Sequence, residues 1–301
     1  MCGIVGYLDK TDGGQGALGE TILGMLQALE CRGPDSAGVA LFGAPQDHRF
    51  TVRVKLGDRG DFRPKVEKLA ELAESLGASE LAKTGSYACF FISDQANVKQ
   101  VMERIESLDP DFEVVSMGST LDIVKQVGSP SNLEATYGIS RMRGGHGIGH
   151  TRLSTESRID LSHSQPFWGH GYPDLAIVHN GHITNYHQLR RRYEQRGTHF
   201  YTENDSEIIA IYLAQQLAKG CKLEASLQSM LSEFYGSYSC LAATANELGF
   251  VKDPYALKPL LVAETDRFVA LANEEIAIRA QLPGTYRVRE ADVKEVRVWQ
   301  R

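Results

Sequence analysis

The sequence predicts an α+β protein, and its order of elements allows sheets sandwiched between layers of helices. Three observations lead to this fold class. Short apolar runs typical of strands lie at both ends of the chain, helical patterns lie in its centre, and a middle stretch alternates the two. The 301 residues are 42% hydrophobic, which suffices for a large core.

The first 45 residues alternate short apolar runs with glycine. We expect a strand at 2–8, an amphipathic helix at 19–30 and a strand at 37–42. The segment Arg32-Gly33-Pro34-Asp35-Ser36 forms the turn between the last two elements. This region therefore reads as strand, helix, strand.

The sequence pattern changes at residues 44–143, where helix-like and strand-like segments alternate. We predict that these residues form a small α/β insertion with its own core. Its pattern indicates helices at 64–76, 96–108 and 121–127, with strands at 87–93 and 112–116. We expect the whole chain, 1–301, to form one domain that contains this insertion.

Beyond residue 144 the strand patterns return, and their ends are polar and marked by glycine. We expect strands at 147–152 and 175–180, followed by helices at 185–196, 206–217 and 223–234. Short strands are then expected at 239–243, 260–263, 268–271 and 293–299. Strands at both ends around central helices fit the sandwich.

Charge and cysteine content exclude several functions. The net charge of -6 argues against nucleic acid or an anionic membrane as the main partner. The five cysteines are odd in number and contain no CxxC pair, which favours a reducing compartment over a disulfide framework or cluster site. No apolar run is long enough to cross a bilayer, and no signal peptide is evident, so we expect a cytoplasmic protein.

Cys2 directly follows the initiator methionine. Removal of Met1 would leave one residue that carries both a thiol and a free α-amino group. The reference pKa of an α-amino group, about 7.7 to 8.0, allows the neutral amine to take the thiol proton near physiological pH. Cys2 is therefore the candidate nucleophile, with its own amine as base.

Four further motifs accompany Cys2-Gly3-Ile4-Val5-Gly6. They are Arg32-Gly33-Pro34-Asp35-Ser36-Ala37-Gly38, Gly149-His150-Thr151-Arg152 with Thr155, Asn180-Gly181-His182-Ile183-Thr184-Asn185, and Asn204-Asp205-Ser206-Glu207. In type and order the five resemble the class II glutamine amidotransferases. That resemblance implies a four-layer αββα N-terminal-nucleophile hydrolase fold and release of ammonia from glutamine.

The residue types suit free glutamine, which is a zwitterion with an amide tail. Arg152 offers a planar fork for the α-carboxylate, Thr155 a nearby hydroxyl, and Asp205 a counter-charge for the α-ammonium. Asn180 and Gly181 supply two donors for the oxyanion that forms during attack. The resemblance assigns these positions the same roles.

Each of these site residues could instead have a purely structural role. Arg152 could form an ordinary ion pair, Asp205 could be the N-cap of the next helix, and Asn180-Gly181 could be a tight turn between strands. Asp205 could both cap and bind ammonium. We place Arg32 outside the substrate contacts, holding the N-terminal turn, although a purely structural role is equally consistent with the sequence.

No metal is expected, since the histidines at 163, 170, 179 and 182 lack a tight ligand pattern. No cofactor is expected on this chain either. Residues 155–165 follow Arg152 and are a candidate lid over glutamine.

The resemblance also implies a partner, because class II domains usually feed ammonia to a synthase domain. Residues after 273 are too few for one, so we expect the acceptor site on another polypeptide. Stand-alone chains of this length resemble the separate subunit of split glutamate synthases and of N-methylglutamate synthases. In those assemblies FMN and iron–sulfur centres lie on other subunits.

Maturation is expected to need only removal of Met1, with no propeptide before Cys2. Two alternatives remain open: an N-terminal-nucleophile amidase that acts on another amide, and a noncatalytic binding subunit. The role of the insertion is not determined by the sequence.

Overall fold

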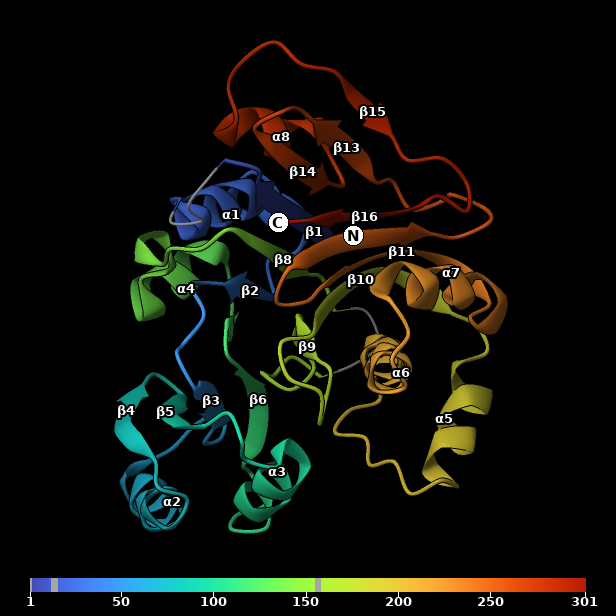
Figure 1. Cartoon of the computed structure of the whole chain (residues 1–301). Helices are drawn as coiled ribbons and strands as arrows, with labels where there is room; N and C mark the ends of the chain where they lie inside the picture. Colours follow the sequence, from blue (N-terminus) through green and yellow to red (C-terminus); the bar gives the residue numbers. More distant parts are fainter. Residues whose placement is uncertain (1, 12–15, 155–157) are drawn as a thin grey trace.

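The computed structural model describes residues 2–11, 16–154 and 158–301 and contains two large antiparallel sheets (Figure 1). The seven-stranded sheet has the order β15 (Val288–Glu290), β13 (Leu261–Glu264), β14 (Phe268–Ala272), β1 (Gly3–Asp9), β8 (His146–Arg152), β2 (Ser36–Phe42) and β7 (Leu121–Val127). The five-stranded sheet has the order β16 (Val296–Gln300), β12 (Glu247–Lys252), β11 (Gly236–Ala243), β10 (Ala176–Ile183) and β9 (Phe167–Trp168).

Helices cover the outer face of each sheet. The seven-stranded sheet packs against α1 (Leu18–Gln27), α4 (Pro130–Tyr137) and α8 (Glu275–Gln281), near the short helices η1 (Glu30–Arg32) and η2 (Ile139–Arg141). The five-stranded sheet packs against α6 (Asp205–Ala218) and α7 (Leu223–Glu233), and α5 (Tyr186–Glu194) packs on α6. The predicted four-layer αββα sandwich is confirmed. In the described part of the chain, no helix has both the length and the apolar character to cross a membrane.

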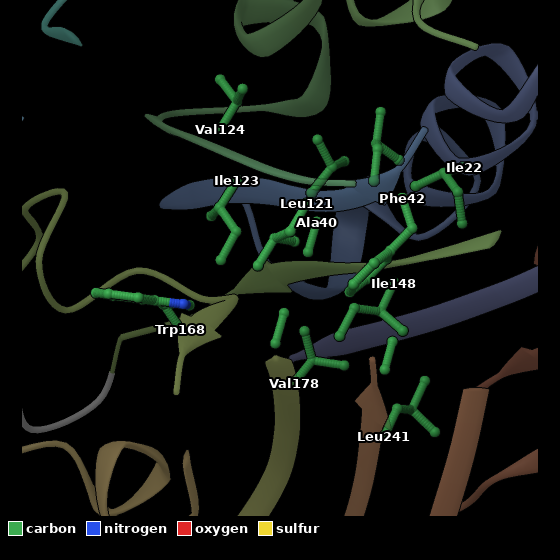
Figure 2. Close-up of a cluster of buried hydrophobic side chains, with 14 of the residues drawn as sticks. Ile22, Ala40, Phe42, Leu121, Ile123, Val124, Ile148, Trp168, Val178 and Leu241 are labelled. Atoms are coloured by element: carbon green, nitrogen blue, oxygen red, sulfur yellow. The ribbon is translucent and has the colours of Figure 1, made fainter. Parts of the chain in front are cut away.

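One part of the core lies between the two sheets (Figure 2). Ala40 and Ile148 reach into it from the seven-stranded sheet, and Val178 and Leu241 reach into it from the five-stranded sheet. All four side chains are fully buried. Burying a branched aliphatic side chain contributes about 1.5 to 3 kcal/mol. This apolar layer therefore fixes the spacing of the sheets whose ends carry the site.

The insertion extends from this sandwich at the lower left of Figure 1. It contains a four-stranded sheet of order β4 (Ser79–Thr84), β5 (Tyr87–Ser93), β3 (Arg49–Lys55) and β6 (Glu113–Gly118), with helices α2 (Arg63–Ser75) and α3 (Val98–Glu106). These elements lie within the predicted range 44–143. The expectation of a separate core is wrong, because the buried apolar side chains of the insertion are continuous with those of the sandwich.

The helix expected at 121–127 is also wrong, because this segment is the edge strand β7. It pairs with β2 in a register that joins Ala40 to Ile123. Leu121 and Ile123 point into the core between the sheets, two residues apart, as the pleat of a strand requires (Figure 2). A seven-residue segment with four apolar and three polar residues does not distinguish strand from helix, so the pairing with β2 decided the conformation.

Candidate active site

Cys2 lies at the start of β1, and the register of the sheet places it beside the end of β8. Gly3 pairs with Thr151, so Cys2 is next to Arg152 across the two strands. The Cys2 side chain is half-buried, and its Sγ lies 3.7 Å from the carbonyl oxygen of Leu153. Cys2 and Arg152 line a cavity of about 480 Å³.

The same cavity is lined by residues of β10 and of the first turn of α6. Its described lining is Cys2, Arg152, Leu153, Ser154, Gln165, His179, Asn180, Gly181, His182, Ile183, Thr184, Tyr186, His187, Arg190, Glu203, Asn204, Asp205 and Ser206. The structure therefore brings together five of the predicted site residues: Cys2, Arg152, Asn180, Gly181 and Asp205. Thr155 lies outside the described residues, as does the start of the expected lid.

Asn180 and Gly181 lie within β10 and are not a turn between strands. Asn180 pairs with Ser239 and Gly181 with Tyr238 of β11. The Asn180 Nδ2 atom donates to the Cys2 carbonyl oxygen at 3.2 Å, so this amide is directed at the nucleophilic residue. The alternative prediction of a tight turn at Asn180-Gly181 is therefore wrong, because β10 continues to Ile183.

Gly181 has a backbone conformation that an L side chain rarely adopts, with φ of 152°. A Cβ at this position would lie 2.2 Å from the Ser237 carbonyl oxygen and 2.6 Å from the Tyr238 Cα. Both close atoms belong to the backbone of the neighbouring strand and do not move independently. Glycine is therefore required here for β10 to pair with β11 beside the nucleophile.

Arg152 is the last residue of β8 and is 5% exposed. One of its terminal nitrogens donates to the Arg158 carbonyl oxygen at 2.9 Å. Burial lowers the pKa of the Arg152 guanidinium, while the nearby Cys2, Asp160 and Asp35 favour its charged form. A fork-shaped cation thus lines the wall of the cavity next to Cys2.

Asp205 is the first residue of α6, and the helix cap is its neighbour. Asn204 is the N-cap, and its side chain accepts a hydrogen bond from the Ser206 backbone N–H at 3.0 Å. The N-cap reading of Asp205 is therefore wrong. Its Oδ2 atom instead accepts from the Ile183 backbone N–H at 2.8 Å. A carboxylate in the first turn is favoured by the helix dipole, which places a stable negative charge at the cavity.

Arg32 contacts the nucleophilic residue from outside the cavity. Its Nε atom donates to the Cys2 carbonyl oxygen at 3.3 Å, and a terminal nitrogen pairs with Glu274. The Cys2 carbonyl therefore receives hydrogen bonds from both Arg32 and Asn180. This geometry agrees with the expected position of Arg32 at the N-terminal turn.

Sequence reasoning did not identify Gln165, His179 and Ser206 as a connected group. The Gln165 side-chain amide donates to the His179 carbonyl oxygen at 3.0 Å and accepts from the His179 backbone N–H at 2.6 Å. The same amide donates to Ser206 Oγ at 3.1 Å. These bonds tie β10 to the first turn of α6. No motif signals the set, because the partners of Gln165 are 14 and 41 positions away.

Gly38, the last residue of the Arg32–Gly38 motif, lies against the chain segment that contains Gln165. A Cβ on Gly38 would lie 2.2 Å from the Gln165 carbonyl oxygen. The motif glycine thus lets the segment that carries Gln165 approach β2 closely.

No three His, Cys, Asp or Glu side chains within 2–11, 16–154 and 158–301 are grouped so that they could hold a metal ion. His163 instead pairs with Asp160 at 2.7 Å, and His179 Nδ1 lies 2.9 Å from Ser206 Oγ.

Comparison with known proteins gives a consistent result. A profile of the glutamine amidotransferase domain matches residues 150–280. The chain is 34% identical to a putative glutamine amidotransferase of Methanothermobacter thermautotrophicus over the full length of both proteins. It is 33% identical to the glutamine amidotransferase-like protein GlxB of Rhizobium meliloti, over all of this chain and 95% of that protein. An amidophosphoribosyltransferase of Methanothermobacter thermautotrophicus matches 58% of the chain at 31% identity, and the match spans 36% of that enzyme.

Solved structures share the fold. The allosteric regulatory enzyme of purine biosynthesis superposes with a TM-score of 0.65 at 20% identity, over 99% of this chain and 46% of that one. The glutamine phosphoribosylpyrophosphate amidotransferase of B. subtilis gives 0.63 at 19% identity, over 99% of this chain and 49% of that one. The sandwich is therefore that of the N-terminal-nucleophile hydrolases. With the two relatives that match along nearly their whole length, the chain belongs to the class II glutamine amidotransferases and is an enzyme.

Proposed function

We propose that this chain is a glutaminase subunit that hydrolyses L-glutamine through a thioester on Cys2 and passes ammonia to a separate synthase subunit. The observation that carries the first part is the single cavity lined by Cys2, Arg152, Asn180 and Asp205. It combines a thiol, a cation, an amide donor and an anion, which are the groups that a zwitterionic amide requires.

In this mechanism removal of Met1 frees the α-amine of Cys2, which takes the thiol proton. The thiolate attacks the side-chain amide carbon of glutamine, and a C–S bond forms. The oxyanion accepts hydrogen bonds from the Asn180 amide and the Gly181 N–H. The protonated amine then gives its proton to the departing nitrogen, the C–N bond breaks, and ammonia leaves. Water deprotonated by the same amine cleaves the thioester and releases glutamate.

Arg152 and Asp205 bind the two charges of the substrate backbone in this proposal. The Arg152 guanidinium pairs with the α-carboxylate, joined by Thr155, and the Asp205 carboxylate pairs with the α-ammonium. Both charges line the cavity together with the nucleophile. An amide without an amino-acid head group would leave both of them without a ligand partner, so glutamine is favoured over other amides.

A separate synthase is the second part of the proposal. Two relatives match this chain over 100% and 95% of their own length. In the amidophosphoribosyltransferase, the matched region makes up only 36% of the protein. These lengths support a synthase on a separate polypeptide. We propose a partner of glutamate synthase or N-methylglutamate synthase type, with any FMN or iron–sulfur centres on that partner.

Covalent labelling tests the glutaminase site. The Met1-free protein is incubated with 6-diazo-5-oxo-norleucine, and the adduct is mapped by mass spectrometry. We expect one adduct per chain, on Cys2, and none on the Cys2→Ala variant. Labelling that persists in Cys2→Ala, or active protein that retains Met1, contradicts the mechanism. Purification from the native host, followed by ammonia-transfer assays with any synthase that co-purifies, tests the partner.

A further inference from the structure

The insertion contacts two segments that adjoin the candidate glutamine site, one that follows Arg152 and one that precedes Asp205. We propose that the insertion is a two-point support for substrate binding. Asp58, Lys55 and Glu113 position the side that carries Arg152, and Glu106 positions the side that carries Asp205. This inference rests on the roles proposed above for Arg152 and Asp205.

The first contact joins the insertion to the segment that follows Arg152. Asp58 Oδ1 accepts a hydrogen bond from the Leu161 backbone N–H at 3.0 Å. Lys55 Nζ donates to Ser162 Oγ, which in turn donates to Glu113 Oε2, each at 2.5 Å. Two consecutive residues of the segment are therefore held by side chains of the insertion.

The charges at this first contact are buried and paired. Lys55 is 7% exposed and Glu113 is 6% exposed. Burial acts to raise the pKa of Glu113, but the ammonium groups of Lys125 and Lys55 outweigh it and lower that pKa. Glu113 is thus an ionised acceptor. A hydrogen bond from Ser162 to a buried carboxylate is stronger than one between neutral groups.

The supported segment in turn contacts the residues of the cavity. The Arg158 carbonyl oxygen accepts from Arg152 at 2.9 Å. The His163 carbonyl oxygen accepts from Asn204 Nδ2 at 3.3 Å. Residues 158–163 are therefore placed between the insertion on one side and the substrate site on the other. A shift of this segment moves a direct partner of the Arg152 guanidinium.

The second contact reaches the Asp205 side through Tyr201. Glu106, the last residue of α3, accepts from the Tyr201 hydroxyl at 2.7 Å. The Tyr201 backbone N–H donates to Glu207 Oε1 at 2.7 Å, and Thr202 donates to the other oxygen of Glu207 through its N–H and its hydroxyl. Glu207 lies in the first turn of α6, two residues after Asp205. The insertion is thus linked to the helix turn that carries Asp205.

The two contacts make separable predictions: the first bears on Arg152 through the Arg158 carbonyl and reaches the Asp205 turn only through the Asn204 cap, whereas the second bears on the Asp205 turn alone. Ser162→Ala removes one of the two links on the Arg152 side, and Asp58→Ala removes the other. Tyr201→Phe removes only the hydroxyl that binds Glu106. Three substrates distinguish the sides: glutamine, glutaramate, which lacks the α-ammonium, and 4-aminobutanamide, which lacks the α-carboxylate.

We expect Ser162→Ala to raise the KM for glutamine and glutaramate about three- to ten-fold and to raise that for 4-aminobutanamide by a clearly smaller factor, because the segment reaches the Asp205 turn only through Asn204. Tyr201→Phe should raise the KM for glutamine and 4-aminobutanamide to a similar extent and leave glutaramate unchanged. The kcat for glutamine should change less than two-fold in both, since neither residue touches the reacting atoms. Analogues that turn over too slowly are compared through their inhibition constants against glutamine.

Two matched control variants each lose a similar side-chain hydrogen bond in another part of the protein. Ser140→Ala removes a hydroxyl that donates to Glu134 at 2.7 Å, and Tyr212→Phe removes a hydroxyl that contacts Ser229 at 2.7 Å. Both should retain the wild-type KM for every substrate. Hydrogen exchange provides a readout without catalysis: the amides of 158–163 should exchange faster in Ser162→Ala and Asp58→Ala, but not in Ser140→Ala.

Failure of the proposed glutaminase function and failure of the two-point support give different results. Wild-type protein that does not hydrolyse glutamine, with or without its synthase partner, refutes the proposed glutaminase function. Active wild-type protein whose folded Ser162→Ala, Asp58→Ala and Tyr201→Phe variants keep the wild-type KM values and exchange rates refutes the two-point support. A KM increase that is equal for all three substrates also refutes it, because general destabilisation does not distinguish the two charges.

Discussion

Burial of His150 predicts a loss of stability in mild acid. His150 lies on β8 between β1 and β2 and is 1% exposed. Burial, together with the nearby charge of Arg152, lowers its pKa to about 3. In the unfolded chain the imidazole titrates near its ordinary value of about 6.5. Below that pH the unfolded state takes up a proton that the folded state does not, so stability falls as the pH falls from about 6.5 toward 3.

The size of this effect follows from the two pKa values. At pH 7 the imidazole is mostly neutral in both states and costs only about 0.2 kcal/mol, whereas at pH 5 the cost is about 2 kcal/mol. His150 alone should therefore remove roughly 2 kcal/mol of unfolding free energy between pH 7 and pH 5. This is a substantial part of a typical folding free energy of about 5 to 15 kcal/mol.

Urea unfolding of the wild type and of His150→Gln at pH 7 and pH 5 measures the effect. The variant can differ in absolute stability, but its loss between the two pH values should be smaller than that of the wild type by about 2 kcal/mol. His48→Gln is the matched control, because the His48 side chain is 95% exposed, and it should lose as much as the wild type. An equal loss in wild type and His150→Gln would refute the argument, since it would mean that His150 titrates alike in both states.

Two further predictions concern the cavity. Gly181→Ala would place a Cβ 2.2 Å from the Ser237 carbonyl oxygen at a φ of 152°, and we expect a loss of about 1 to 3 kcal/mol in urea unfolding together with loss of 6-diazo-5-oxo-norleucine labelling. Gly171→Ala, which also has positive φ but no atom within 4 Å of the added Cβ, should lose less stability and keep its labelling; equal effects would show that backbone strain alone is responsible. Asp205→Asn keeps the side-chain shape and removes the charge, so the KM for glutamine should rise about 30- to 1000-fold in steady-state assays, while glutaramate should be affected little; an unchanged KM for glutamine would contradict ammonium binding at this residue.

The chemistry-bearing residues and the α+β class were predictable from the sequence because both depend on local patterns, whereas the four-layer arrangement was expected only from the family resemblance. A cysteine after Met1, a fork-shaped cation, an Asn-Gly pair and an acidic residue before a helix each appear as short motifs. Apolar alternation predicted most strands of the two large sheets. The same local reasoning failed at 121–127, where a short segment of mixed apolar and polar residues fits either conformation, and pairing with β2 made it a strand.

The helix cap shows a similar limit at the scale of one residue. Both Asn204 and Asp205 are good caps by residue type. The hydrogen bond from the Ser206 N–H selects Asn204, which leaves Asp205 to accept from Ile183 and face the cavity. Only the position of β10 beside α6 distinguishes the two readings.

The sequence by itself determined which residue types are available for catalysis and in what order the strands and helices occur. The tertiary structure decided which of them meet. Cys2 and Asn180 are 178 positions apart, yet a hydrogen bond joins them because β1 and β10 belong to sheets that pack face to face. The links from the insertion to Leu161, Ser162 and Tyr201 span 49 to 107 positions. Such contacts depend on sheet register and on the packing of the layers, which no local pattern encodes.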